Sequence, residues 1–367
     1  MRNETDPLLS WIGLCNVPGV GRVTFRRLVR RFGSPGRVLT ASAGELETVE
    51  GISRRAIEAI GSFPWREQAA RELARAEQTG TTLITMDDPA YPAGLKDTPD
   101  PPLYLYVRGT LRSEDERAVA IVGTRRPTHY GMTVTARLAS QLASAGLTIV
   151  SGMARGIDTQ AHRGALSARG RTIAVLGCGI DVVYPPENRG LMEQIIKSGA
   201  VVSENPFGTK PEAGYFPARN RIISGLARGT VIIEASNDSG SLVTAQYAVE
   251  QGRKLFAVPG NIGAATSRGT NSLIKQGATL VEGAEDILAG LDFGNPGARQ
   301  ETGARPLPSL SQEEKAVFGC ITNEPKHIDL LMNECRMSAG ALSGALINLE
   351  LKGLAKQLPG KYFVREV

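Results

Sequence analysis

Three short apolar runs decide the fold: VAIVG at residues 119–123, LTIVSG at 147–152 and TIAVLG at 172–177. Each run is apolar at nearly every position, a pattern typical of a strand buried on both faces of a sheet. Four more runs of this kind occur at 200–204, 230–235, 254–260 and 278–283. Helix-length segments follow most of the runs. The seven units predict an α/β fold with a doubly wound, Rossmann-like parallel sheet.

The first 75 residues have a different pattern. The strings VPGV at 17–20 and VEGI at 49–52 each precede an arginine-bearing helical stretch. Glycine in such a turn lets the amides of the next helix approach a phosphate closely. The two copies resemble a tandem helix-hairpin-helix or SAM-like segment, a module that grips nucleic-acid backbones. Six arginines and no acids lie between Arg22 and Arg37, which fits DNA contact and a solvated helix face equally.

The C-terminal part predicts a linker and a third domain. Six of the 18 residues at 292–309 are Gly or Pro, as in a linker. Residues 310–367 begin with the capping box Ser311–Glu314 and continue with two more helical patterns and a β-hairpin, which predicts a winged helix. The third helix carries only Glu350 as a charge, so a protein contact is as compatible with it as DNA reading. The predicted domains are 1–75, 76–291 and 310–367.

Composition excludes several classes of protein. The formal net charge is only +5. The four cysteines lie far apart in the sequence, and their spacing excludes a disulfide framework and the common zinc-ligand spacings. Apolar runs are far shorter than the roughly 20 residues of a membrane span, and the N-terminus lacks the apolar core of a signal peptide. We expect a cytoplasmic protein without a membrane span.

The strand ends predict an anion site. In a doubly wound sheet, ligands bind beyond the carboxyl ends of the strands. Glycine turns follow several of the strands here, and arginines stand beside or before them. Arg125 follows the first predicted strand and Arg155 follows the second. Arg219 and Arg221 precede the fifth predicted strand. Arginine next to backbone amides suits a polyanion, because each phosphate can receive both a guanidinium fork and N–H donors.

Nucleotide cofactors and catalysis fit the sequence poorly. The string GCGIDV at 177–182 has Val182 where a dinucleotide motif needs its third glycine, and there is no Walker A string. Asp158 and His162 have the spacing of a metal pair, but an acid near a helix start is ordinarily a cap. Ser239 and Ser241 are likewise expected to cap a helix. We predict no cofactor, no metal and no catalytic residue.

Six ordered motifs between about residues 81 and 291 closely resemble the DNA-processing protein A family, DprA, also called Smf. They are IVGTRRPTHYG (121–131), SGMARGIDTQAH (151–162), LGCGIDVVYPPEN (176–188), FPARNRIISGL (216–226), EASNDSGSLVTAQYAVEQGRKLFAVPG (234–260) and GTNSLIKQGA (269–278). The helical segment in front and the winged helix behind agree with one arrangement of that family. The resemblance implies a non-enzymatic protein that binds and protects incoming single-stranded DNA. It also implies a homodimer formed through the Rossmann-like domain and a role in loading the RecA recombinase during natural transformation.

The same resemblance assigns the binding residues. Arg125 is expected to be a principal phosphate contact and Phe216 a stacking platform for a base. A lysine that some members carry three residues before this phenylalanine is Ala213 here, with Lys210 as a possible substitute. The expected single-strand contacts are Gly123, Thr124, Arg125, Ser151, Gly152, Arg155, Phe216, Arg219, Asn220, Arg221, Ser239, Gly240 and Ser241. For Phe216, packing of a helix start stays an alternative, as does ion pairing within the fold for Arg219 and Arg221.

Two other functions remain open at this point. Nucleotide N-glycosidases on a related fold carry P-G-G-x-G-T-x-x-E, and alignment on Thr244 places Tyr247 at the catalytic glutamate, which counts against hydrolysis. A sequence-specific regulator would read DNA with the winged helix, against which the neutral third helix argues.

Overall fold

A nine-stranded sheet forms the centre of the protein. The computed structural model describes residues 7–291, 310–322 and 324–365. The strand order is β1-β2-β6-β5-β4-β3-β7-β8-β9. The strands are β1 Thr82–Thr85, β2 Tyr104–Gly109, β3 Ala118–Val122, β4 Thr148–Ser151, β5 Thr172–Val175, β6 Ala200–Ser203, β7 Gly229–Ile232, β8 Lys254–Ala257 and β9 Thr279–Leu280.

The seven predicted strands are β3 to β9. All hydrogen-bonded neighbours among these strands pair in parallel, which confirms the predicted fold class. The last of them is shorter than its apolar run. Strands β1 and β2 were not predicted; β2 pairs antiparallel with β6, and β1 pairs antiparallel with β2. Neither of these strands belongs to a strand–helix unit, so the repeat that identified the others does not include them.

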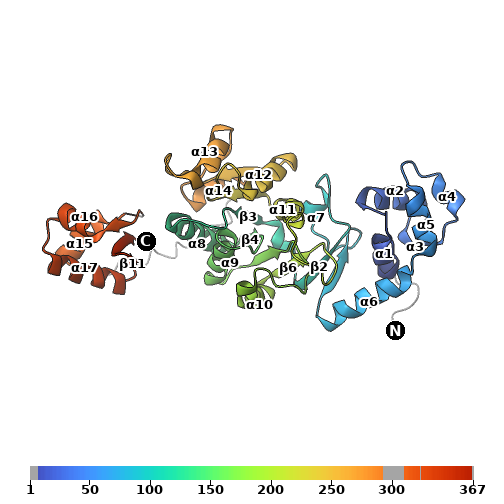
Figure 1. The fold of residues 1–367 in the computed structure, drawn as a ribbon, viewed down its shortest axis with the longest axis horizontal. Coiled ribbons are helices and arrows are strands. Elements are labelled where there is room, and N and C mark those ends of the chain that lie inside the picture. The colour runs from blue at the N-terminus through green and yellow to red at the C-terminus, as the bar shows by residue number, and fades with distance from the viewer. Residues whose placement is uncertain (1–6, 292–309, 323, 366–367) are drawn as a thin grey trace.

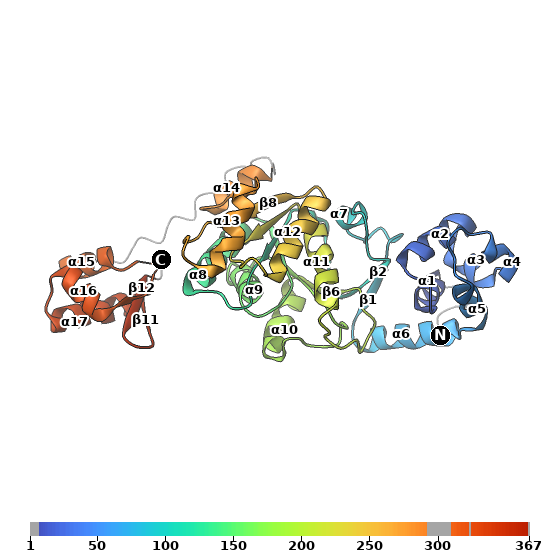
Figure 2. The same ribbon diagram turned by 45° about the horizontal axis from the view of Figure 1, so that its top comes forward.

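Apolar side chains of the strands point into two cores, one on each face. Val119 and Ile121 of β3 pack with α8, α9 and α14, whereas Ala120 and Val122 pack with α11 and α12. Figure 1 shows these helices covering the sheet, and Figure 2 shows α11 and α12 side by side. The helices of this part are α7 Ala93–Lys96, α8 His129–Ser144, α9 Ile157–Ser167, α10 Arg189–Ser198, α11 Tyr215–Gly225, α12 Gly240–Glu250, α13 Arg268–Lys275 and α14 Ala284–Gly290, with short 3₁₀ turns η1 Ser113–Glu116, η2 Pro186–Asn188 and η3 Ala265–Ser267.

The strand order places a switch point between β3 and β7. From β3 the chain proceeds through β4, β5 and β6 in one direction, and then returns to β7, β8 and β9 on the other side. Connections on the two sides of such a point leave opposite faces of the sheet, which opens a crevice at the carboxyl edge. A ligand site is therefore expected where β3, β4 and β7 end.

From residue 7 onward, six helices precede the sheet, which confirms a helical N-terminal part. They are α1 Pro7–Asn16, α2 Arg22–Phe32, α3 Pro35–Thr40, α4 Ala43–Glu47, α5 Arg54–Ser62 and α6 Trp65–Gln78. The two predicted hairpins have the same turn. Val20 N donates to Val17 O (3.1 Å) and Ile52 N to Val49 O (3.3 Å), with Gly19 and Gly51 at φ 85° and 75°. The repeat seen in the sequence is thus a structural repeat.

Part of the arginine cluster of α2 has partners inside the protein. Arg22 contacts Asp100 (2.9 Å) and Glu204 (3.1 Å), and Arg26 donates to Pro101 O (2.7 Å). These arginines join the helical part to the sheet domain, while Arg30 and Arg31 are exposed. Arg22 and Arg26 thus have a packing role within the protein, while DNA contact by this segment stays a prediction.

The C-terminal part is a winged helix, as predicted. It contains α15 Gln312–Cys320, β10 Lys326–His327, α16 Ile328–Cys335, α17 Ala339–Leu351, β11 Ala355–Leu358 and β12 Tyr362–Arg365. The predicted capping box is present, since Ser311 Oγ accepts from Glu314 N (3.1 Å) and Glu314 accepts from Ser311 N (2.7 Å). The linker predicted at 292–309 lies outside the described residues. Across the described ranges, no helix is both long and apolar enough to cross a membrane.

Candidate functional site

A cavity of about 550 Å³ opens at the carboxyl ends of β3 and β4, between the starts of α11 and α12. This is the place that the switch point predicts. Of the 13 expected contact residues, those lining the cavity are Gly123, Arg125, Phe216, Arg219, Asn220, Ser239, Gly240 and Ser241. The cavity is also lined by Val122, Ala154, Asp158, Tyr184, Pro211, Ala213, Pro217, Ile223 and Thr244.

Phe216 forms one wall of the cavity. Its ring centre lies 5.3 Å from the guanidinium carbon of Arg125 and 5.9 Å from that of Arg219. Gly177, at the end of β5, makes room for it, because a Cβ atom at this position would lie 2.8 Å from Phe216 Cδ1. The ring is half-buried rather than part of a core. A flat aromatic face flanked by two cations suits a nucleobase with its phosphates.

Arg125 is the exposed cation of the site. It forms no ion pair with a carboxylate in the part of the chain that the structure describes. The turn that carries it is held by Glu234, whose carboxylate accepts from Thr128 N (2.9 Å) and Thr128 Oγ1 (2.6 Å). A guanidinium on a fixed turn is well placed to bind phosphate, since little order is lost on binding.

Arg219 is buried and has partners within the fold. Its Nη1 donates to Gly152 O (2.7 Å) and to Val175 O, and its Nε donates to Asn220 Oδ1 (3.1 Å). Burial lowers the pKa of Arg219 to about 10, with the nearby charge of Asp158 opposing the shift, so the group is charged at neutral pH. Gly152 leaves space for the Arg219 guanidinium, because a Cβ atom at position 152 would lie 2.7 Å from Arg219 Nη2.

Asp158 lies on α9 next to this guanidinium. Burial raises the pKa of Asp158 to about 6, while Arg219 and the amide of Ala154 oppose the shift. His162, one turn later, has Thr172 Oγ1 at 2.7 Å from its Nδ1, and burial lowers its pKa to about 3. The two side chains thus have separate hydrogen-bond partners. Residues 7–291, 310–322 and 324–365 contain no group of three or more His, Cys, Asp or Glu suited to a metal ion.

The start of α12 closes the cavity on the β7 side. Ser239 caps the helix by accepting from Ser241 N (3.4 Å), as the sequence predicted, and Asn220 Nδ2 donates to Gly240 O (3.3 Å). Gly240 is exposed at the first turn of this 11-residue helix. Its amide end therefore adds partial positive charge beside Arg125 and Arg219.

Five of the expected contact residues do not line the cavity. Arg221 is buried and pairs with Glu204 (2.5 Å) and Asp100 (3.3 Å). Of the two interpretations given for this residue, ion pairing within the fold is the one observed. Thr124 N donates to Glu234 O (2.8 Å), so this amide is not directed to a ligand. Ser151 Oγ donates to Ile121 O (2.7 Å) inside the sheet. Gly152 packs against Arg219, and Arg155 lies at the rim in an ion pair with Glu187.

Sequence reasoning missed Tyr184 as a site residue. Its ring centre is 5.5 Å from that of Phe216, with the planes tilted by 38°, and it lines the same cavity. The residue stands in the quoted VVYPPEN string. Its place in a loop near glycine turns could have indicated this role, because binding residues are disproportionately found on loops positioned by a rigid scaffold.

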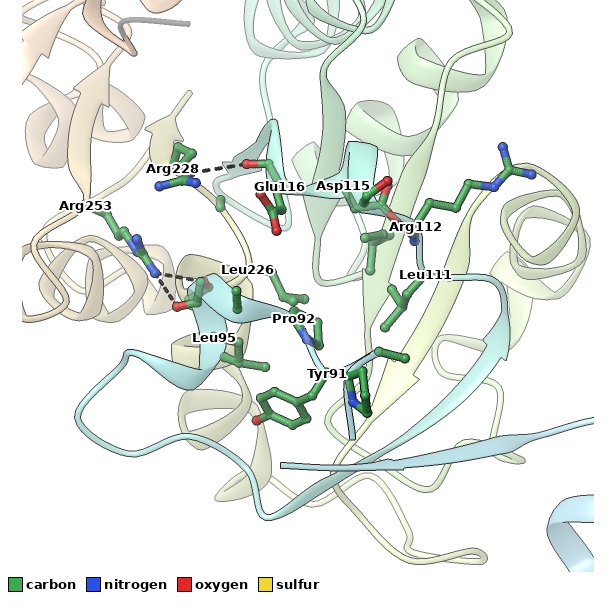
Figure 3. Close-up of a pocket in the computed structure, with 18 residues that line it drawn as sticks. Tyr91, Pro92, Leu95, Leu111, Arg112, Asp115, Glu116, Leu226, Arg228 and Arg253 are labelled. Carbon is green, nitrogen blue, oxygen red and sulfur yellow. Dashed lines mark hydrogen bonds between the residues drawn. The ribbon is translucent and has the colours of Figure 1, made fainter. Parts of the chain in front are cut away.

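A second cavity of about 250 Å³ lies at the opposite, amino edge of the strands, under α7 (Figure 3). Tyr91, Leu95 and Leu226 contribute apolar walls. Arg253 Nη2 donates to the carbonyl oxygens of Gly94 (2.5 Å) and Gly225 (3.2 Å), which ties α7 to the end of α11. None of the expected contact residues lines this second cavity.

Comparison with known proteins gives consistent matches. Residues 82–292 match the family described as DNA recombination-mediator protein A, and residues 301–361 match the DprA winged helix domain. The Smf protein of Synechocystis sp. is 37% identical, with 97% of this chain and 98% of that protein covered. The DNA processing protein DprA of Bacillus subtilis is 43% identical over 59% of this chain and 74% of its own.

Solved structures agree with this likeness. DNA processing protein A from Streptococcus pneumoniae superposes with a TM-score of 0.70 at 33% identity, over 78% of this chain and 98% of that one. A structure from Helicobacter pylori, described as showing a unique single-stranded DNA binding mode of its DNA processing protein A, gives a TM-score of 0.52 at 33% identity, over 57% and 95% of the two chains.

Proposed function

This chain belongs to the DNA-processing protein A (DprA/Smf) family, and from that premise we propose that it binds single-stranded DNA, without sequence preference, in the cavity between β3, α11 and α12. The observation that carries the proposal is the Phe216 ring, which lines the cavity with Arg125 and Arg219 within 6 Å of its centre (5.3 and 5.9 Å). The H. pylori relative supports it, since that protein is described as a single-strand binder. Stacking and phosphate contacts carry no base information, so binding is expected to be indifferent to sequence.

Fluorescence anisotropy with a labelled single strand, competed with the matching duplex at two or more salt concentrations, tests the proposal. We expect single-strand preference and a fall of log affinity with log salt of about 0.7 per phosphate contacted. Weak or duplex-preferring binding would remove the proposed function.

Removing the aromatic face of Phe216 should weaken binding moderately. Leucine in its place keeps apolar contact with Gly177 but cannot stack on a base, so we expect Phe216→Leu to lower single-strand affinity about fivefold, near the low end of measured stacking effects. Tyr215→Leu is the matched control, because Tyr215 is the exposed neighbour that does not line the cavity. Equal effects of the two substitutions would contradict a stacking role for Phe216.

Binding should strengthen as the pH falls through about 6. Asp158 lines the cavity with a pKa raised to about 6, and an incoming phosphate favours its neutral form over the carboxylate. It is faced by Arg219 from α11, Arg125 from the β3 turn and the amide of Ala154, while His162 stays uncharged through this range. We expect affinity at constant ionic strength to drop by up to about tenfold from about pH 5 to about pH 7.5, since one pKa unit is a tenfold effect.

Asp158→Asn isolates this group from the other acids that titrate in the same range, such as Glu204 with its pKa of about 7. The variant should have the low-pH affinity throughout and a flatter profile. An unchanged profile would assign the pH dependence to another group.

We further propose a homodimer formed through the sheet domain, as the family resemblance implies. In the described ranges, strand β9 is an edge strand that pairs only with β8, and both of its residues, Thr279 and Leu280, are exposed. An exposed strand edge is a ready surface for pairing with another chain. Light scattering should give a mass near twice 39.1 kDa, and Leu280→Lys should shift it toward the monomer. A wild-type mass of one chain would remove this proposal.

A non-enzymatic role in protecting DNA and loading RecA completes the proposal. Among the described residues that line the cavity, Asp158 is the one carboxylate, and Tyr247 stands where a nucleotide N-glycosidase has its glutamate. Incubation with nucleoside monophosphates should therefore release no free base. RecA assembly on a single strand should become faster in the presence of the protein, and an unchanged assembly rate would remove the loading role.

A further inference from the structure

The rim of the cavity carries an ion pair that the proposed function does not explain. Arg155, in the turn after β4, directs Nε to Glu187 Oε1 and Nη2 to Glu187 Oε2 (3.1 Å). The carboxylate thus occupies the guanidinium fork with both oxygens. A phosphate of a bound strand would use this same fork, because carboxylate and phosphate present oxygens in similar geometry.

The pair is close to the proposed strand path. Ala154, the residue before Arg155, lines the cavity, and so does Tyr184, three positions before Glu187. The pKa of Arg155 is raised chiefly by its hydrogen bond to Glu187 and also by Tyr184. Arg155 is therefore the direct neighbour of a residue of the cavity wall, and its guanidinium is bound to Glu187.

The position of Glu187 is fixed by the backbone around it. The next residue, Asn188, is buried, and its Nδ2 donates to Met153 O (3.0 Å) and Thr159 Oγ1 (2.9 Å). These bonds hold η2 against the β4 turn and keep the carboxylate beside Arg155. An ordinary surface pair between two flexible elements lacks such an anchor.

We infer that Glu187 is a built-in competitor of DNA: its carboxylate takes the place of a phosphate on Arg155 and is displaced when the single strand binds. This inference rests on the proposed function. Both side chains are about half exposed, at 55% and 52%, so the pair can open toward water at small cost. Arg155 then adds to the binding free energy only the difference between its phosphate contact and the lost ion pair. A ligand that makes several other contacts in the site is therefore the one best able to displace the carboxylate.

A double-mutant cycle of Arg155→Ala and Glu187→Gln on the full chain tests this, with a labelled oligothymidylate of about 20 nucleotides as the probe. We expect Glu187→Gln to tighten binding about fivefold when Arg155 is present and at most about twofold when it is alanine. Correspondingly, Arg155→Ala should weaken binding more in the Glu187→Gln background than in the wild type. All variants should melt like the wild type, since the pair is exposed.

Glu67→Gln is the matched control, because Glu67 forms a similarly exposed pair with Arg71 on α6, with the two side chains 61% and 66% exposed. At about 0.1 M salt, charges beyond roughly 10 Å are screened, so this variant should bind like the wild type. Weaker binding by Glu187→Gln would show that Glu187 positions Arg155 and would overturn the inference. An equal gain in both backgrounds would reduce Glu187 to a general charge effect and overturn it as well. Failure of the wild type to bind the probe would instead remove the proposed function itself.

Discussion

Arg125→Ala should lower the affinity for a labelled single strand by at least tenfold and leave the melting temperature unchanged. The side chain is exposed at the cavity and has no carboxylate partner in the described ranges, so its charge is free for a phosphate. A hydrogen-bonded contact to a charged group is worth about 1.5–3 kcal/mol, which corresponds to roughly ten- to hundredfold in affinity. Since no internal contact of this guanidinium with an acid is lost, the folded state should be unaffected.

Arg126→Ala provides the control for net charge. Arg126 is the next residue, is also exposed and does not line the cavity. Its removal should weaken binding by no more than about threefold, through the general field of the protein alone. If both substitutions weaken binding alike, or if Arg125→Ala binds normally with a native melting curve, Arg125 is not in the site.

The periodic part of the fold could be predicted from the sequence, and its connections could not. Seven apolar runs predicted seven parallel strands because strands buried on both faces need apolar residues at nearly every position. The order of these strands depends on which crossover packs on which face, and no single segment encodes it. Strands β1 and β2 belong to no repeat and pair antiparallel, so they lacked the pattern used for the others.

The sequence predicted where the candidate site lies at the carboxyl ends of the strands, but not the role of each side chain around it. Glycine turns and arginines after parallel strands indicated where an anion would bind, and Arg125 and Phe216 do line one cavity. The role of each neighbour depended on burial, which the sequence does not give. Arg221 stands two residues from Arg219 yet points to Glu204 and Asp100, away from the cavity. Gly152, one of the expected contacts, makes room for Arg219, and Gly177 makes room for Phe216.

Arg219→Met should lower the free energy of unfolding by about 3 kcal/mol, the scale observed when one member of a buried charged pair is removed. The substitution removes the donor of Gly152 O and Val175 O and leaves the buried Asp158 without its nearest cation. Buried acceptors that lose their donor keep their desolvation cost, so methionine of similar length does not restore stability. Urea denaturation followed by circular dichroism measures the change.

The pH dependence separates this mechanism from a simple loss of packing. Arg219 is the largest influence that lowers the pKa of Asp158, so its removal should raise that pKa above the present value of about 6. A carboxyl group whose pKa is raised on folding stabilises the folded state when protonated, and this stabilisation is lost as the pH rises through the folded pKa. The deficit of Arg219→Met should therefore be smaller near pH 5 than near pH 8, and Asp158→Asn should recover part of it at high pH. A deficit independent of pH would assign the effect to packing. Wild-type stability combined with lost single-strand affinity would instead make Arg219 a direct phosphate contact.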